Sequence, residues 1–357
     1  MWMVPRMMGT VLAVVLVVAW GAAGWGAAAQ TGDLDPLPRP VKVRIAEDGA
    51  ASGAGFYLAE ALGYFKAYNI EVEWVTFINS DDMLPAIAAG QLDVAGGISS
   101  ASLFNAVAQG FDVRIISDKG HAVETGSYFT LVIRKDLADQ VRDYSDLKGL
   151  TVAYSAQDAV DHYMTVKALE AGGLGPEDVE LVVIQDFAQM LAGLATGAID
   201  VAMEIEPLIT SGVEQGIIER FLDTSVYLPD AQVAVVLASP QFVADREVAL
   251  RFMLAYLKGL RDFNDVFFHG RGDRERVVQV MTEYTLLKDP ELWSRVQPPG
   301  LDPDGGVNVE SLVDQYEFYK ANGALVGEVD PRQVIDLSLA QEAVAILGPY
   351  QAGDPGD

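Results

Sequence analysis

Polar and acidic residues follow several apolar stretches of the chain, and these side chains are suited to hydrogen bonding with a small polar molecule. In open parallel sheets, ligands bind at the carboxyl ends of the strands, where the N-termini of helices also point. The expected strands therefore nominate two sets of candidates, one in each half of the chain. They are Asp48, Gly97, Ser99, Ser100 and His121 in the first half, and Ser155, Gln157, Asp158, Glu204 and Glu206 in the second.

Several of these candidates also have a purely structural interpretation. Ser99, Ser100 and Ser155 stand where helices begin and can cap them. Glu206 precedes Pro207 and can cap the helix that follows. Glu204, two positions earlier on the same strand face, carries the more specific expectation of ligand contact.

Other kinds of chemistry find little support in the residues present. The chain contains no cysteine, so disulfides, a thiol nucleophile and thiolate metal sites are excluded. The glycines of loop 49–55 do not form G-x-G-x-x-G, and no Walker sequence is present. We expect neither a metal nor a cofactor, because no H-E-x-x-H accompanies the metal-ligand-like residues, which are His121, Glu124, His162 and His269.

An internal repeat organises the chain. Residues 43–95 align without a gap on residues 150–202, at an offset of 107, and seven of the thirteen positions that start at Met83 and Met190 are identical. Asp93 and Asp200 are also identical, but each follows a glycine that ends a helix, so we expect structural caps. Solenoid units run to only about 20–50 residues. This repeat therefore predicts two similar α/β lobes with a cleft between them.

Each repeat is expected to hold a strand-helix-strand-helix-strand unit. Helices between the strands indicate mainly parallel sheets with right-handed crossovers. The chain beyond residue 240 is expected to be helical almost to its end. The expected strands are 41–46, 70–77, 92–98, 114–117, 128–134, 151–154, 179–184, 199–205 and 231–238.

The N-terminal segment, 1–29, is typical of a cleavable secretory signal. Arg6 is its only charge, an apolar run follows from Val11 to Trp20, and the segment ends in small residues at Ala27–Ala29. A retained transmembrane anchor is the alternative, although the run is shorter than the ~20 residues that a span needs. We expect a mature protein that is soluble in a periplasm and not inserted in the membrane.

The charge balance excludes one class of partner. Without residues 1–29 the chain has 23 basic and 51 acidic residues, a net charge of −28. Nucleic-acid binding depends on neutralising phosphates with Lys and Arg, so nucleic acid is not expected as a partner. The acidity itself indicates solubility and does not bear on the fold.

Several ordered motifs between residues 41 and 240 carry a resemblance to a known family. They are Gly55–Phe65, Ala89–Val94, Asp146–Ala153 and Glu206–Pro207. In these motifs the chain resembles the sulfonate-, nitrate-, taurine- and thiamine-precursor-binding proteins of ABC importers.

The resemblance implies a type II periplasmic binding fold in which the first lobe is interrupted by the second. The first lobe would comprise residues 41–130 and 232–350, the second 131–231, and residues 351–357 would form a disordered tail. It implies a monomer without catalytic activity, which captures one small ligand and delivers it to a permease. The expected cleft walls are the loop after the first strand, Ser99–Ser100, Ser155–Asp158 and the segment that ends at Glu206–Pro207.

The chain differs from the sulfonate binders at positions that would select the charge of the ligand. Asp158 and Asp161 stand where a sulfonate site would want hydroxyl and amide donors, and Glu204 replaces a residue that is often apolar or aromatic in those relatives. Burying carboxylates beside an anion is unfavourable. We therefore favour a neutral or cationic, nitrogen-bearing ligand, such as a pyrimidine-type vitamin precursor. A sulfonate, taurine or nitrate binder, a module that reports ligand to a membrane kinase, and a pyrimidine-synthase-like enzyme remain as alternatives.

Overall fold

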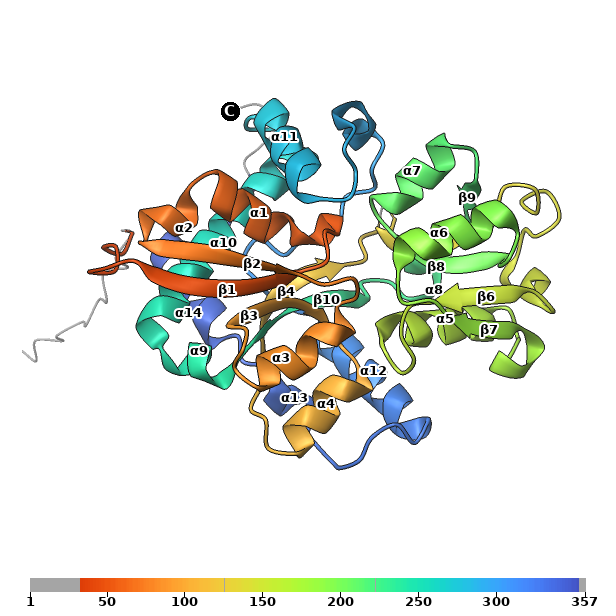
Figure 1. Cartoon of the computed structure of the whole chain (residues 1–357), viewed down its shortest axis with the longest axis horizontal. Coiled ribbons are helices and arrows are strands. Elements are labelled where there is room, and N and C mark those ends of the chain that lie inside the picture. Colours follow the sequence, from red (N-terminus) through yellow and green to blue (C-terminus); the bar gives the residue numbers. More distant parts are fainter. Residues whose placement is uncertain (1–32, 125, 222, 353–357) are drawn as a thin grey trace, which may run out of the picture.

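The computed structural model describes residues 33–124, 126–221 and 223–352, which form two lobes side by side along the long axis of the molecule (Figure 1). Each lobe is built on a five-stranded sheet. The expected signal segment, residues 1–29, and residues 353–357 of the expected tail lie outside the described residues. Among the helices that are described, none is long and apolar enough to cross a membrane.

The sheet of the first lobe combines four parallel strands with one that runs against them. Its strands are Val41–Glu47 (β1), Ile70–Thr76 (β2), Val94–Ile98 (β3), Arg114–His121 (β4) and Gln232–Ala238 (β10), in the order β2-β1-β3-β10-β4. β1 pairs in parallel with β2 and β3, whereas β10 is antiparallel to both β3 and β4. β10 is the strand that returns from the second lobe.

The second sheet has the same design. Its strands are Phe129–Arg134 (β5), Thr151–Tyr154 (β6), Glu180–Val183 (β7), Val201–Ile205 (β8) and Ile218–Arg220 (β9), in the order β7-β6-β8-β5-β9. Here β5, the strand that enters from the first lobe, is the antiparallel one. The predicted α/β class with mainly parallel sheets is confirmed.

Helices flank both sheets (Figure 1). Those of the second lobe are Val160–Ala171 (α5), Phe187–Thr196 (α6), Leu208–Glu214 (α7) and Thr224–Tyr227 (α8). The others are Ala54–Ala61 (α1), Tyr64–Ala67 (α2), Leu84–Ala88 (α3), Ala101–Ala108 (α4), Pro240–Ala244 (α9), Arg246–Phe267 (α10), Arg274–Tyr284 (α11), Val309–Ala321 (α12), Pro331–Val334 (α13) and Ser338–Leu347 (α14). Short 3-10 turns lie at Ala51–Gly53, Asp81–Met83, Tyr144–Leu147, Pro176–Asp178 and Pro290–Ser294.

The long helix α10 anchors the core of the first lobe. Its apolar residues recur at helical spacing, so that Phe252, Tyr256 and Leu260 share one buried face. This face packs against α1, where the rings of Phe56 and Tyr256 lie 4.6 Å apart. The contact of α1 with α10 holds the loop after β1, which borders the cleft, against a rigid support.

The repeat is visible in the hydrogen bonds as well as in the strands. Asp93 Oδ2 accepts the backbone N–H of Arg44 at 2.8 Å, and Asp200 Oδ2 accepts that of Thr151 at 3.0 Å. Arg44 and Thr151 are themselves equivalent positions in the repeat register. The two aspartates therefore have equivalent structural roles. Asp93 holds β1 beside the start of β3, and Asp200 holds β6 beside the start of β8.

Gly63 separates α1 from α2, because it adopts a left-handed conformation with φ +82°. One strand differs from the expected pattern. β4 continues to His121 instead of ending at Ser117, which carries Asp118 and Lys119 into the sheet. The sequence did not indicate this extension because two charged residues rarely occupy a fully buried strand without partners.

Candidate ligand-binding cleft

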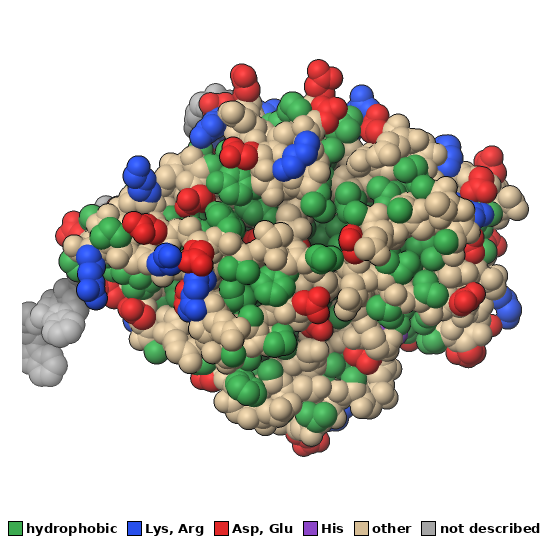
Figure 2. Space-filling model, in the orientation of Figure 1, with side chains coloured by type: hydrophobic (Ala, Val, Ile, Leu, Met, Phe, Trp, Pro, Cys, Tyr) green, Lys and Arg blue, Asp and Glu red, His purple; other side chains and the backbone are tan. Residues whose placement is uncertain are grey.

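The candidate site is a cleft between the two lobes, with an empty volume of about 380 Å³ counted out to its mouth. The surface is hollowed where the lobes meet (Figure 2). The lining residues are Asp48, Ser52, Asn79, Ser80, Ile98 and Lys119 from the first lobe, Tyr128, Phe129, Ser155, Val160, Asp161, Phe187 and Ile205 from the second, and Val233 and Ala234 from β10.

Three pairs of lining residues stand at equivalent positions of the repeat. They are Asp48 with Ser155, Ser80 with Phe187, and Ile98 with Ile205, and each pair is separated by the repeat offset. Equivalent segments thus contribute to the cleft from both lobes. Two of the pairs differ in side chain, whereas Ile98 and Ile205 are identical. The sequence contained this information, since the repeat register alone pairs these positions.

The lobes touch directly around the cleft. The backbone N–H of Ala101 donates to the carbonyl of Asp158 at 2.8 Å, and that of Ala51 donates to the carbonyl of Glu206 at 3.2 Å. Asn79 Nδ2 donates to the carbonyl of Gln185 at 3.3 Å. These contacts show the molecule with its lobes closed on each other.

Gly97 and Glu204, which the sequence placed at the ligand, lie outside the lining. A Cβ at Gly97 would lie 2.5 Å from Leu237, so this glycine serves packing within the sheet. Side chains of a strand alternate between the two faces, and the next residues, Ile98 and Ile205, face the cleft instead. Ligand contact by Gly97 and Glu204 stays a prediction.

Glu204 is nevertheless an unusual residue. It is fully buried; Oε1 accepts the backbone N–H of Ile205 at 3.0 Å, and Oε2 has no hydrogen-bond partner among the described residues. Burial raises the pKa of Glu204 well above the usual value, and the nearby carboxylates of Glu206 and Asp186 raise it further.

Glu206 and the two serines after β3 make structural contacts. Glu206 accepts hydrogen bonds from the backbone N–H of Thr210 at 3.0 Å and from its hydroxyl at 2.8 Å, which matches the cap interpretation. Ser100 caps α4 through the N–H of Leu103 at 3.3 Å. Ser99 is buried, and its hydroxyl has no partner among the described residues. None of the three lines the cleft.

Gln157 and Asp158 lie at the rim where the lobes meet. Gln157 is exposed and accepts a hydrogen bond from the hydroxyl of Tyr154. Asp158 has φ +52°, and its Oδ1 accepts from Asn322 Nδ2 of the first lobe at 3.1 Å. Asp158 therefore contributes to closure, whereas the side-chain contacts of Gln157 stay within the second lobe. Neither residue lines the cleft.

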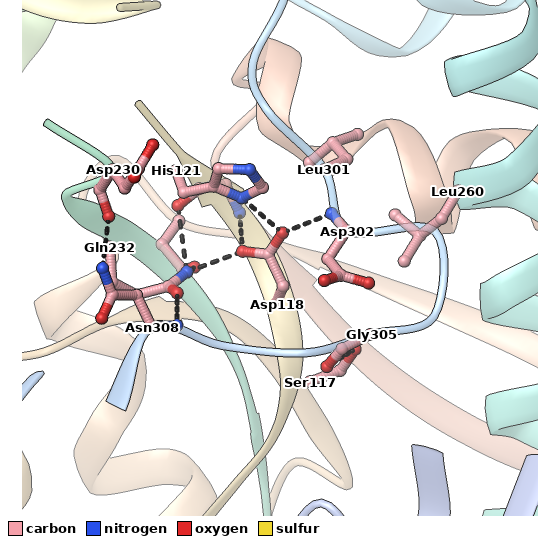
Figure 3. A network of polar contacts seen from close by, with 12 residues as sticks. Ser117, Asp118, His121, Asp230, Gln232, Leu260, Leu301, Asp302, Gly305 and Asn308 are labelled. Atoms are coloured by element: carbon pink, nitrogen blue, oxygen red, sulfur yellow. Dashed lines mark hydrogen bonds and ion pairs between the residues drawn. The ribbon is translucent and has the colours of Figure 1, made fainter. Parts of the chain in front are cut away.

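His121 belongs to a different network, shown in Figure 3. Its Nδ1 lies 2.9 Å from Asp118 Oδ2, and the same carboxylate binds Gln232 Nε2 at 2.6 Å and the backbone N–H of Asp302 at 2.7 Å. Burial alone lowers the pKa of His121, but Asp118 and its acidic neighbours together raise it. This network joins β4, β10 and the loop before α12, and His121 does not reach the cleft.

Sequence reasoning missed a buried ion cluster in the cleft. Lys119 is 1% exposed, and its Nζ lies 3.2 Å from Glu47 Oε1, 3.9 Å from Asp48 Oδ1 and 3.3 Å from Ser52 Oγ. Burial lowers the pKa of Lys119, but the two carboxylates outweigh this effect and raise it. Burial raises the pKa of Glu47 to about 7 although Lys119 lowers it. Two carboxylates thus share one ammonium.

Asp161 is the acidic residue of the opposite wall. It lies at the start of α5, lines the cleft and is 1% exposed. Its Oδ2 accepts the backbone N–H groups of Ser155 and Ala156, the latter at 3.2 Å. Burial raises the pKa of Asp161, and these hydrogen bonds oppose the rise. Of the candidate site residues that the sequence named, Asp48 and Ser155 line the cleft, and Asp161 joins them from the start of α5.

Metal chemistry finds no ready site in the described ranges. They contain no group of three or more His, Asp or Glu side chains placed to hold a metal ion.

Two similar lobes, joined by two crossings of the chain and closed over a polar cleft, define the two-lobed periplasmic binding fold. A family model described as "NMT1/THI5 like" matches residues 51–265, and the chain belongs to this family. The resemblance noted in the sequence is confirmed. No curated protein sequence matches the chain.

Solved structures of low sequence identity share the fold. The alkanesulfonate-binding protein SsuA from Xanthomonas axonopodis pv. citri, bound to MOPS, is 18% identical with a TM-score of 0.68, over 84% of this chain and 99% of that one. The periplasmic aliphatic sulphonate-binding protein SsuA from Escherichia coli is 20% identical with a TM-score of 0.66, over 85% of this chain and 99% of that one. The periplasmic nitrate-binding protein NrtA from Synechocystis PCC 6803 is 15% identical with a TM-score of 0.71, over 87% of this chain and 89% of that one.

Proposed function

We propose that this protein captures a small molecule in the cleft between its lobes and delivers it to the permease of an ABC importer. The observation that carries the proposal is the cleft itself. Buried polar groups from both lobes line it, and its walls come from equivalent loops of the repeat. A site split between two lobes is complete only when the lobes are closed, so ligand binding and closure are coupled.

The structural relatives and the N-terminal sequence support a periplasmic location. The alkanesulfonate-binding and nitrate-binding proteins that share the fold are described as binding proteins, two of them as periplasmic. We propose the same compartment here, reached through the N-terminal signal. The chain would act as a monomer that docks to a permease.

Capture without catalysis is the favoured role. The alternative role is that of a pyrimidine-synthase-like enzyme, and the resemblance implies a histidine and a cysteine-rich loop for such an enzyme, but the chain has no cysteine. The cleft lining contains no histidine either, since His121 and His162 lie outside it. The cleft presents hydrogen-bonding groups and aromatic surface, which are the means of recognition.

Ligand is expected to stabilise the protein against heat. A compound that binds only the closed folded form adds about 2.7 kcal/mol to the free energy of unfolding at a hundredfold excess over its Kd. A thermal-shift screen should include vitamins and their precursors, amines, sulfonates and inorganic oxoanions. If all of them leave the melting temperature of ligand-free protein unchanged, solute capture loses its main support.

A further inference from the structure

The N-terminus of α5 meets the cleft, and two backbone N–H groups just before this helix are already occupied. α5 spans Val160–Ala171, and the N–H groups of Ser155 and Ala156 precede it. Such N–H groups, together with the helix dipole, form a natural anion site. Here both bind Oδ2 of Asp161, a carboxylate of the same chain. An incoming anion would therefore find these two donors taken and a carboxylate beside them.

The second oxygen of Asp161 is left for a ligand. Oδ1 is buried and makes no hydrogen bond of normal geometry to any described residue, although the Ser155 side chain lies nearby. Leaving a buried carboxylate oxygen without a donor is unfavourable. Because Asp161 lines the cleft, a donor on the ligand can supply the missing hydrogen bond.

The opposite wall does not offset this charge. Lys119 is the one cationic side chain in the lining as described, and Glu47 and Asp48 share its ammonium. Asp48 also accepts hydrogen bonds from the hydroxyl of Ser80 at 2.7 Å and the N–H of Ala50 at 3.1 Å. The acidic groups at the cleft thus outnumber the basic one, and the local field disfavours an anion.

Aromatic side chains complete the surface beside Asp161. The rings of Phe129 and Phe187 lie 5.9 Å apart at an interplanar angle of 84°, and both line the cleft with Tyr128. Rings at this angle offer one edge and one face, against which a small flat molecule packs well.

We propose that Asp161 sets the charge specificity of the cleft, accepting an N–H group from a neutral or cationic nitrogen compound and excluding anions. This inference rests on the proposed function and deepens it. The ligand class is a small ring or amidine-like molecule with an N–H donor and no anionic group. The sulfonate and nitrate ligands of the structural relatives fall outside this class.

The substitution Asp161→Asn tests the inference with little change in shape. Asparagine retains one oxygen to accept the N–H groups of Ser155 and Ala156, and it replaces the free carboxylate oxygen with an NH₂ donor. Glu170→Gln, an exposed acid on the same helix, is the matched control. The probes are 4-aminopyrimidine, benzamidine and methanesulfonate, with affinities measured by calorimetry and folding by circular dichroism.

We expect the wild type and Glu170→Gln to bind at least one of the two nitrogen compounds and to prefer it to methanesulfonate. In Asp161→Asn the ratio of the two affinities should move toward methanesulfonate by at least tenfold. An unchanged ratio, or tighter binding of methanesulfonate by the wild type, overturns the role of Asp161 and leaves solute capture standing. If the wild type binds neither these probes nor any class in the wider screen, capture fails and the inference falls with it.

Discussion

Replacing Lys119 by methionine is expected to lower the free energy of unfolding by about 3–5 kcal/mol, the usual effect of removing one partner of a buried ion pair. Methionine fills most of the same volume, so the effect comes from charge. Glu47 and Asp48 would be left in the closed floor of the cleft without their shared ammonium. Urea unfolding followed by circular dichroism measures the change.

The surface pair Lys42–Glu73 provides the control. Its atoms lie 2.9 Å apart, but the side chains are 62% and 48% exposed. Lys42→Met should therefore change the free energy of unfolding by no more than about 1 kcal/mol. Adding Glu47→Gln to Lys119→Met should restore part of the loss, because one unpaired carboxylate is then removed. Equal effects of the two lysine substitutions would show that the cluster is not buried as described.

Gly259→Ala is the second substitution for which we expect a large effect. On helix propensity alone, alanine should stabilise the middle of α10 by about 1 kcal/mol. A Cβ at this position would instead lie 2.3 Å from the carbonyl oxygen of Gly55 in α1. Backbone cannot move aside as a side chain can, so α1 and α10 must separate. We expect a net loss of about 1–3 kcal/mol or more, measured by urea unfolding.

Gly193 in α6 is a matched helical glycine with a different neighbour. A Cβ there would lie 3.2 Å from the side chain of Ile199, which can adjust. Gly193→Ala should therefore be neutral or stabilise by up to about 1 kcal/mol. If both alanine variants stabilise the protein, the close crossing of α1 over α10 is wrong.

The repeat explains why so much of the fold could be predicted. Its register pairs β1 with β6, β2 with β7 and β3 with β8, and it pairs Ile98 with Ile205 at the cleft. The repeat does not indicate which face of a strand turns toward the other lobe. For this reason the sequence predicts ligand contact at Gly97 and Glu204, whereas the adjacent residues, Ile98 and Ile205, line the cleft.

Other features depend on contacts between distant segments. Lys119 on β4 and Glu47 on β1 are far apart in the sequence, and nothing in the local sequence indicates that they meet. His121 follows a strand as a ligand-binding residue would, but the loop that carries Asp302 closes over it. Hydrophobic periodicity places residues on elements, whereas the partners of a buried charge depend on how the elements assemble.

The most direct test of solute capture is mass spectrometry of small molecules released by denaturing protein purified from its native compartment. A matched sample of Ser155→Trp, in which the indole fills the cleft, gives the comparison, with circular dichroism to show that it is folded. Our account predicts one nitrogen-containing compound without an anionic group, at up to one molecule per chain, in the wild type and not in the variant. Equal amounts of the compound in both proteins would contradict binding in the cleft. Wild-type protein that carries no compound and gains no stability from any class in the thermal-shift screen would contradict capture itself.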